Sequence, residues 1–419
     1  MVEKLKNKII FLLHWSERYT KTDMVYLFKG GFWLTLGQIF SSIAAFAVSV
    51  AFANFFPKEI FGVYKYILSI FGILAIFSLP GLSSALTKAF SKGFSGSYLE
   101  VFYYRIRWAL LGSLVAIITS GYYFLQGNTV LGFSFIIVAA ALPFFDSLSI
   151  YNSYLHSKKR FKEFSYINAI NQIIPAIGLI ITIIFFKNVW LILGVYFSFH
   201  IILRFIFFKK FNKETTIKEK TPKEVFSYGK HLSLMGVLGT LSAHIDKVLV
   251  FQLLGGTELA LYTIAIAPID QIKGFFKNIS FLAWPKFAEQ SFENIREVLF
   301  GKLKKFFVFL TVVITIYILL APFFFNLFFP TYTQSIIYSQ VLAISVIFAI
   351  LGTIPYAFLE SHGSKKSLYT YNIIGNIFSI ATLLILIPFY GLWGAIIARF
   401  TTRIVSYLLL ILLIKKESR

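Results

Sequence analysis

Charged side chains inside long apolar segments are the residues of this sequence with the clearest chemical potential. His244, Asp246 and Lys247 stand in one such segment, and Asp270 and Lys273 stand in the next. If these segments cross a membrane, each charge costs about 2.5 to 3.5 kcal/mol at mid-span and must face protein or water. The chemistry expected of such residues is recognition of an ion or a charged substrate in a wet passage.

The composition places these segments in a lipid bilayer. Of the 419 residues, 58% are hydrophobic and only 14% are charged, against roughly 25% charged residues in an average soluble domain. Fifty Phe and 23 Tyr leave too little polar surface to cover a soluble globule. The formal charge of +22 lies between apolar runs, which argues against a nucleic-acid partner. The absence of cysteine excludes disulfides and thiolate metal sites, and no metal site is expected.

The elements that position the charges are predicted to be transmembrane helices. A bilayer core about 30 Å thick requires about 20 apolar residues per helix. We therefore expect an all-α integral membrane protein. The predicted spans are 32–55, 64–86, 108–125, 130–153, 164–186, 189–208, 231–254, 259–284, 306–328, 335–360, 368–387 and 391–414.

The distribution of lysine and arginine predicts the direction of these spans. Alternate connections are rich in cations, whereas the connections on the other side hold only Lys58, Lys65 and Lys187. Because positively charged loops stay in the cytoplasm, both termini are predicted to be cytoplasmic. The basic N-terminal arm has no short apolar core with a cleavage site, so no removable signal peptide is predicted.

A weak internal repeat divides the chain. The predicted domains are an N-terminal six-helix lobe with its basic arm (1–208), a cytoplasmic linker (209–230) and a C-terminal six-helix lobe (231–419). Tyr64 aligns with Tyr262, although similar composition alone could give such an alignment. Since each lobe has an even number of spans, the lobes are expected to relate by a pseudo-two-fold axis along the membrane normal. A cleft between them is the expected transport path.

The C-terminal lobe carries a predicted surplus of positive charge. Five embedded cations oppose Asp246 and Asp270, namely Lys247, Lys273, Lys277, Arg399 and Arg403. A wet cavity with this balance attracts an anion. The alternative is that the cations snorkel to the interface or form structural ion pairs. A single histidine, His244, has no second ligand at metal spacing and is interpreted as a packed side chain.

Uncharged polar residues dominate the N-terminal lobe. The candidate sugar contacts are amides on the fifth and eleventh spans and one glutamine on the first: Asn168, Gln172, Asn372, Asn376 and Gln38. Such groups suit sugar hydroxyls, but they equally suit hydrogen bonds between helices.

Several motifs in order along the chain resemble one family of membrane proteins. They are EIFGVYKYILSI (59–70), PGLSSALTKAF (80–90), HIDKVLVFQLLGGTELALYTIA (244–265), AWPKFAE (283–289) and LIPFYGLWGAIIARF (386–400). The sequence resembles the O-antigen flippases of the Wzx type, in the polysaccharide transporter branch of the superfamily that contains MATE exporters and lipid II flippases.

This resemblance implies a MATE-like, two-lobed transporter that works by alternating access in the bacterial inner membrane. Its substrate would be an oligosaccharide on undecaprenyl diphosphate, with membrane lipids and polysaccharide assembly proteins as partners. No cofactor is implied beyond a coupling ion, H⁺ or Na⁺, for which Asp246, Asp270 and Asp146 are the candidate sites. Arginines described in the N-terminal lobe of some relatives have no mid-span counterpart here, since Arg105 and Arg107 lie at the inner edge of a span.

Two other classes of protein remain as alternatives. A cation-coupled exporter of MATE type would prefer an anionic cavity, which is the opposite of the predicted balance. A polysaccharide polymerase would be an enzyme with a sizeable external loop, but the predicted outer connections are as short as GGTE (255–258) and PFYG (388–391). No phosphate-binding loop of the Walker type occurs, so ATP is not expected to drive transport directly.

Overall fold

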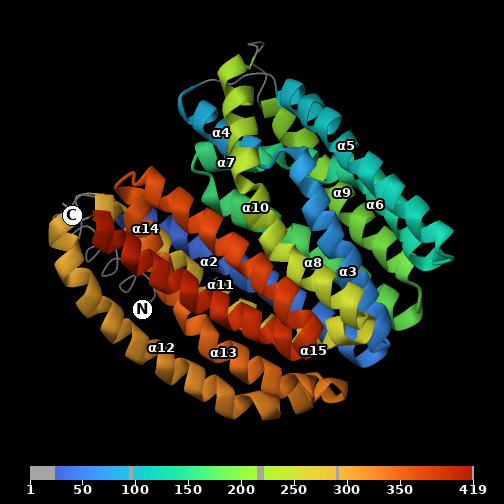
Figure 1. Ribbon diagram of the computed structural model, residues 1–419. Coiled ribbons are helices and arrows are strands. Elements are labelled where there is room, and N and C mark those ends of the chain that lie inside the picture. Colours follow the sequence, from blue (N-terminus) through green and yellow to red (C-terminus); the bar gives the residue numbers. More distant parts are fainter. Residues whose placement is uncertain (1–23, 94–97, 215–220, 289–291, 418–419) are drawn as a thin grey trace, which may run out of the picture.

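The computed structural model describes residues 24–93, 98–214, 221–288 and 292–417 (Figure 1). Within these ranges every regular element is a helix, which confirms the all-α prediction. Eleven of the described helices are long and apolar enough to cross a membrane. The chain is therefore a multi-pass membrane protein.

The first half of the chain supplies six of these long helical segments, and two of them are interrupted by a 3-10 turn. Its helices are α2 (Met24–Phe55), α3 (Lys58–Leu74), η1 (Ala75–Ser78), α4 (Gly81–Ser91), α5 (Tyr98–Leu125), α6 (Thr129–Phe145), η2 (Ser147–Ile150), α7 (Tyr151–Ser157), α8 (Phe161–Phe185) and α9 (Val189–Glu214). At about 1.5 Å per residue the longer members exceed the apolar thickness of a bilayer.

The second half begins after the polar connection. Its helices are α10 (Lys223–Leu254), α11 (Gly256–Ala288), α12 (Phe292–Phe328), η3 (Pro330–Tyr332), α13 (Ser335–Leu351), α14 (Thr353–Ser361) and α15 (Lys365–Glu417). Figure 1 shows the two halves side by side, with α10 running between them.

Helix α15 contains two of the twelve predicted spans. Its backbone reverses at Gly391, where φ is 56° and ψ is −133°, a conformation that glycine adopts without a steric penalty. The two arms then run antiparallel, so that their far ends meet. There the hydroxyl of Ser367 donates to Oε1 of Glu417 over 2.6 Å. Counting both arms, the eleven long helices give the twelve predicted crossings.

The second span differs from its predicted form. It begins at Lys58, directly after Pro57, rather than at residue 64. It is also broken at Leu79, the residue before Pro80, where φ is 54°. Proline disfavours helical geometry in the residue before it, and this explains the interruption. As a result Lys65 lies within the span, and α4 follows as a separate amphipathic helix.

The halves are in close contact at the end where α3 and α11 begin. A Cβ atom added to Gly62 would lie 1.9 Å from the carbonyl oxygen of Gly256, so the two backbones touch. Asn54 donates to the carbonyl oxygen of Phe328 over 3.0 Å. Gln252 donates to the hydroxyl of Tyr66 over 2.7 Å. This end of the molecule is therefore closed between the halves.

Helix α10 also contacts the first half along its length. The Gly81 amide donates to the hydroxyl of Ser233 over 3.0 Å. Further along, the His244 ring lies against Gly72 so closely that a Cβ on this glycine would approach it to 2.5 Å. This agrees with the interpretation of His244 as a packed side chain. The remaining space between the halves is lined mainly by α2, α3, α8, α9, α10 and α11.

Candidate substrate-binding site

Four cavities adjoin one another between and within the halves. The central cavity has a volume of 340 Å³, the cationic cavity 650 Å³, and the amide and hydroxyl cavities 680 Å³ each. Asp270 lines both the central and the cationic cavity, Gln172 the central and the amide cavity, and Asn168 the amide and the hydroxyl cavity. Neighbouring cavities therefore share wall residues, and we call the four together the tract.

The cationic cavity gathers most of the charged residues predicted from the sequence. Its walls come from α10, α11, α14 and both arms of α15. The charged members are Asp246, Lys247, Asp270, Lys273, Arg399 and Arg403. Asp270 and Lys273 reach it together because residues three apart lie on one face of a helix. The side chain of Lys277 lies outside the part of the structure that is described.

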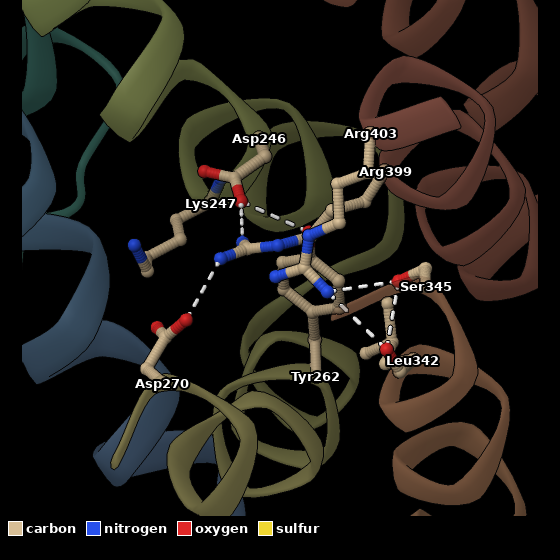
Figure 2. A network of polar contacts seen from close by, with 8 residues as sticks. All are labelled: Asp246, Lys247, Tyr262, Asp270, Leu342, Ser345, Arg399 and Arg403. Carbon is tan, nitrogen blue, oxygen red and sulfur yellow. Dashed lines mark hydrogen bonds and ion pairs between the residues drawn. The ribbon is translucent and has the colours of Figure 1, made fainter. Parts of the chain in front are cut away.

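Arg399 joins both carboxylates of this cavity, as Figure 2 shows. Its Nη1 lies 2.9 Å from Oδ2 of Asp246, and its Nη2 lies 3.2 Å from Oδ1 of Asp270. Asp246 also accepts hydrogen bonds from the Tyr262 hydroxyl at 2.9 Å and from the Lys247 amide at 2.8 Å. The Asp246 side chain is only 7% exposed, whereas that of Asp270 is 47% exposed. One contact of Arg399 is thus buried and the other borders open space.

The other cations are held differently. Arg403 donates to the hydroxyl of Ser345 over 2.8 Å and to the carbonyl oxygen of Leu342 over 3.2 Å, both of which are neutral acceptors. The Lys247 side chain extends away from the Asp246 carboxylate (Figure 2) and also lines the central cavity. The structural ion-pair alternative therefore describes Arg399 but does not extend to Arg403.

Lys65 is a cation of the site that sequence reasoning assigned to an outer connection. It lies on α3 and lines the central cavity together with Lys247 of the opposite half. Its Nζ lies 5.2 Å from the centroid of the Phe61 ring, a favourable cation–π distance. Neither lysine amine forms an ion pair with a carboxylate in the described residues. Pro57, as the start of the helix, was the sequence signal that could have placed Lys65 inside the span.

The central and cationic cavities together carry a surplus of positive charge. Among described residues, two carboxylates line them, Asp246 and Asp270. The five cations are Lys65, Lys247, Lys273, Arg399 and Arg403. The surplus is three, and it includes Lys65 of the first half, which was not among the five predicted cations; the predicted Lys277 side chain lies outside the described residues. Low-dielectric walls strengthen the attraction of such a space for anions.

The amide cavity contains three of the five predicted sugar contacts. Gln38 comes from α2, Asn168 and Gln172 come from α8, and Gln271 of α11 completes the ring of amides. The residues that line this cavity carry no charge. The other two predicted contacts lie elsewhere: Asn372 is exposed and Asn376 faces Gly239 of α10, and neither lines the four cavities.

Asp146 lies apart from the tract, at the break between α6 and η2. It accepts a hydrogen bond from the Ser78 hydroxyl over 3.1 Å, and one oxygen lies 3.6 Å from Nη1 of Arg204. Arg105 donates to the carbonyl oxygen of Ser78 over 2.9 Å and is only 2% exposed. These contacts tie the broken second and fourth spans together, and Asp146 does not line the four cavities.

A family model described as "Polysaccharide biosynthesis protein" matches residues 27–291, more than half of the chain. The chain belongs to this polysaccharide biosynthesis protein family. An uncharacterized membrane protein of Methanocaldococcus jannaschii is 23% identical, in an alignment that covers 88% of this chain and 80% of that protein.

Solved structures show the fold. The lipid II flippase MurJ in an inward closed conformation has a TM-score of 0.73 at 16% identity, covering 91% of this chain and 87% of that one. An inward-facing multidrug resistance MATE transporter of the MOP superfamily has a TM-score of 0.64 at 14% identity, covering 90% and 95%. A MOP superfamily transporter from Pyrococcus furiosus has a TM-score of 0.60 at 14% identity, covering 93% and 96%. The predicted MATE-like fold is confirmed. The three proteins of similar structure are transporters.

Proposed function

We propose that this protein is a flippase that carries an oligosaccharide on undecaprenyl diphosphate from the cytoplasmic to the outer leaflet of the bacterial inner membrane. A Wzx-type, O-antigen-like repeat unit is the proposed cargo. The observation that carries the proposal is a pair of cavities, central and cationic, that together hold three surplus positive charges and adjoin an uncharged, amide-lined cavity. A diphosphate joined to a sugar chain has this same division between an anionic and a neutral part.

The diphosphate is proposed to bind between Lys65 of α3 and Lys247 of α10. Both lysines line the central cavity and come from opposite halves. Two like charges facing one low-dielectric space repel each other, and an anion between them reverses the sign of that interaction. Binding would therefore draw the two halves together, and a change in their relative position is what alternating access requires.

Arg399 links this binding step to a carboxylate. A phosphate oxygen entering the cationic cavity competes with Asp270 for the guanidinium, because that contact borders open space. The buried contact with Asp246 would persist. Asp270, once released, is the proposed site for the coupling ion, H⁺ or Na⁺. Asp246 and Asp146 already have several hydrogen-bonding or charged partners, so they rank behind Asp270 as ion sites.

The conformation of the protein agrees with entry of the substrate from the side of the basic loops, which is the predicted cytoplasmic side. The opposite end is closed by the approach of Gly62 to Gly256. Substrate would reach the central cavity through the amide and hydroxyl cavities, and polysaccharide assembly proteins would receive it on the far side.

Charge distinguishes this proposal from export of cationic drugs. A surplus of positive charge repels a cation, and the walls of the cavity strengthen that effect. For the Pyrococcus furiosus transporter, the reverse polarity of its binding pocket suggests a different function. Pocket charge is therefore a reasonable criterion for separating members of this fold.

The test is transport by the purified protein in liposomes. Undecaprenyl diphosphate carrying a neutral oligosaccharide is incorporated, and an impermeant lectin reports the glycan that reaches the outside. We expect transport by the unmodified protein and a loss of about a hundredfold in the Lys65→Ala/Lys247→Ala variant, since each charged hydrogen bond contributes about 1.5 to 3 kcal/mol.

Lys187→Ala is the matched control, because Lys187 is exposed in the connection between α8 and α9. It should transport at the normal rate. If the unmodified protein moved a fluorescent organic cation but not the glycan lipid, the flippase proposal would be wrong and the exporter alternative would be favoured.

A further inference from the structure

The hydroxyl cavity lies on the proposed entry route, and most of its lining residues differ from those of the other three cavities. Helix α4 and the η2–α7 segment each present a polar stripe to it, and α8 adds Phe164 and Asn168. The opposite face of α4, including Leu82 and Leu86, is buried in the protein. The hydroxyl groups that line the cavity belong to Ser83, Ser84, Thr87, Ser91, Ser149 and Ser153.

Most of these hydroxyls can only accept hydrogen bonds from a ligand. Thr87 donates to the carbonyl oxygen of Ser83 over 2.9 Å, and Ser91 donates to that of Thr87 over 2.8 Å. Ser153 also donates to the carbonyl oxygen of Ser83, over 2.9 Å, and Ser149 donates to that of Asp146 over 2.6 Å. A hydroxyl has one proton and two lone pairs, so each donated bond leaves acceptor capacity.

One further acceptor in this wall has no partner. Oδ1 of Asn152 is buried and receives no hydrogen bond in the described part of the structure. Leaving such an acceptor unpaired costs about 1 to 3 kcal/mol. A ligand that brings hydrogen-bond donors can satisfy it once the Asn152 side chain turns this buried oxygen toward the cavity, whereas an ionised phosphate or carboxylate brings acceptors alone.

The cavity also carries little charge. Lys88 is the one Lys or Arg among its lining residues, and its Nζ already lies 4.9 Å from the centroid of the Tyr228 ring. None of the lining residues is acidic. The His156 ring packs against Phe164, with ring centroids 4.1 Å apart. Thus the cavity is rich in acceptors, poor in charge, and bordered by an aromatic ring.

We propose that the hydroxyl cavity binds the distal, neutral sugars of the glycan and thereby selects for glycan length. Sugar hydroxyls supply the donors that this wall lacks. This inference rests on the proposed function, because it requires the diphosphate end of the same molecule in the central cavity. Helix α8 lines every cavity between the two points, and from Phe164 to Leu179 it covers about 22 Å. That distance accommodates an extended oligosaccharide.

The test compares two substrates in the same liposome assay: undecaprenyl diphosphate carrying one neutral sugar and the same lipid carrying a longer neutral oligosaccharide. The variants are Asn152→Leu, which removes the unpaired acceptor, and Ser84→Leu, which fills the cavity from an exposed position. We expect each variant to slow transport of the longer glycan about tenfold and to leave the one-sugar lipid within about twofold of normal.

Asn372→Leu is the control, since this exposed asparagine lies outside the cavities. Normal transport of the longer glycan by both variants would overturn the inference alone, as would an equal loss with both substrates. A failure of the unmodified protein to move either lipid would instead overturn the proposed function together with the inference.

Discussion

The cationic cavity and the amide cavity adjoin each other, share Gly274, and have similar volumes of 650 and 680 Å³. The first is walled by helices of the second half and holds six charged residues. The second is walled mainly by α2 and α8 and holds none. In a bilayer, charge is far costlier to bury than amides or hydroxyls. The difference supports the proposal that the two halves recognise chemically different parts of one ligand.

The charged side of this comparison depends most on Arg399. Arg399→Ala leaves the Asp246 carboxylate, which is 7% exposed, without its guanidinium. Breaking a buried pair in this way costs about 3 to 5 kcal/mol. We expect a strong loss of folded protein, measured as thermal unfolding of the detergent-solubilised chain.

Adding Asp246→Asn to Arg399→Ala removes the unpaired charge. This double variant should regain most of the stability, but it should not regain transport. If Arg399→Ala alone were as stable as the unmodified protein, the pair would not organise this cavity as described.

A smaller effect is expected at Asp270, which separates ion coupling from substrate binding. Asp270→Asn keeps the shape of the side chain but removes the charge that Arg399 contacts over 3.2 Å. We expect gradient-driven transport to fall about tenfold, a loss equivalent to about 1.4 kcal/mol, while binding of the glycan lipid persists.

The measurement is the initial transport rate in liposomes with and without a pH or sodium gradient. Asp146→Asn is the comparison variant and should keep the response to the gradient, because Asp146 lies outside the cavities. An intact gradient response in Asp270→Asn would assign coupling to another group.

The smallest effect is expected on the uncharged side. Gln172→Leu removes one amide from the boundary of the amide and central cavities. A single neutral hydrogen bond is worth about 1 kcal/mol, so transport should fall about fivefold. The rate is measured with the longer glycan lipid, and Asn372→Leu should leave it unchanged. A loss in Gln172→Leu as large as that from removing the lysines would erase the proposed distinction between the halves.

Much of this arrangement follows from the sequence because burial in lipid is costly. Long apolar windows located the spans, and the rarity of embedded charge singled out Lys247, Asp270 and Arg399. The MATE-like fold was also anticipated, from motifs spread along the whole chain.

The rest depends on contacts that no local pattern encodes. The pairing of Arg399 with Asp246 joins residues 153 positions apart. Lys65 was missed because the span was predicted to begin at residue 64, which put the lysine at the outer edge, whereas the helix begins at Lys58. The hydroxyl stripe of α4 escaped notice because serine and threonine also occur widely as ordinary partners of helical carbonyl groups.

The most direct test of the central claim uses the natural absence of cysteine. Ser242→Cys places a thiol in the cationic cavity and Ser42→Cys places one in the amide cavity, and neither removes a charge. Each thiol is reacted with water-soluble methanethiosulfonates that carry a negative or a positive group.

We expect both thiols to react. The ratio of the reaction rate with the anionic reagent to that with the cationic reagent should be at least about tenfold higher at position 242 than at position 42. A tenfold ratio corresponds to about 1.4 kcal/mol. This is less than the interaction between two unit charges about 4 Å apart at an effective dielectric constant of about 20, which is about 4 kcal/mol. Equal ratios at the two positions, or a thiol at position 242 that water-soluble reagents cannot reach, would contradict a wet, positively charged substrate path.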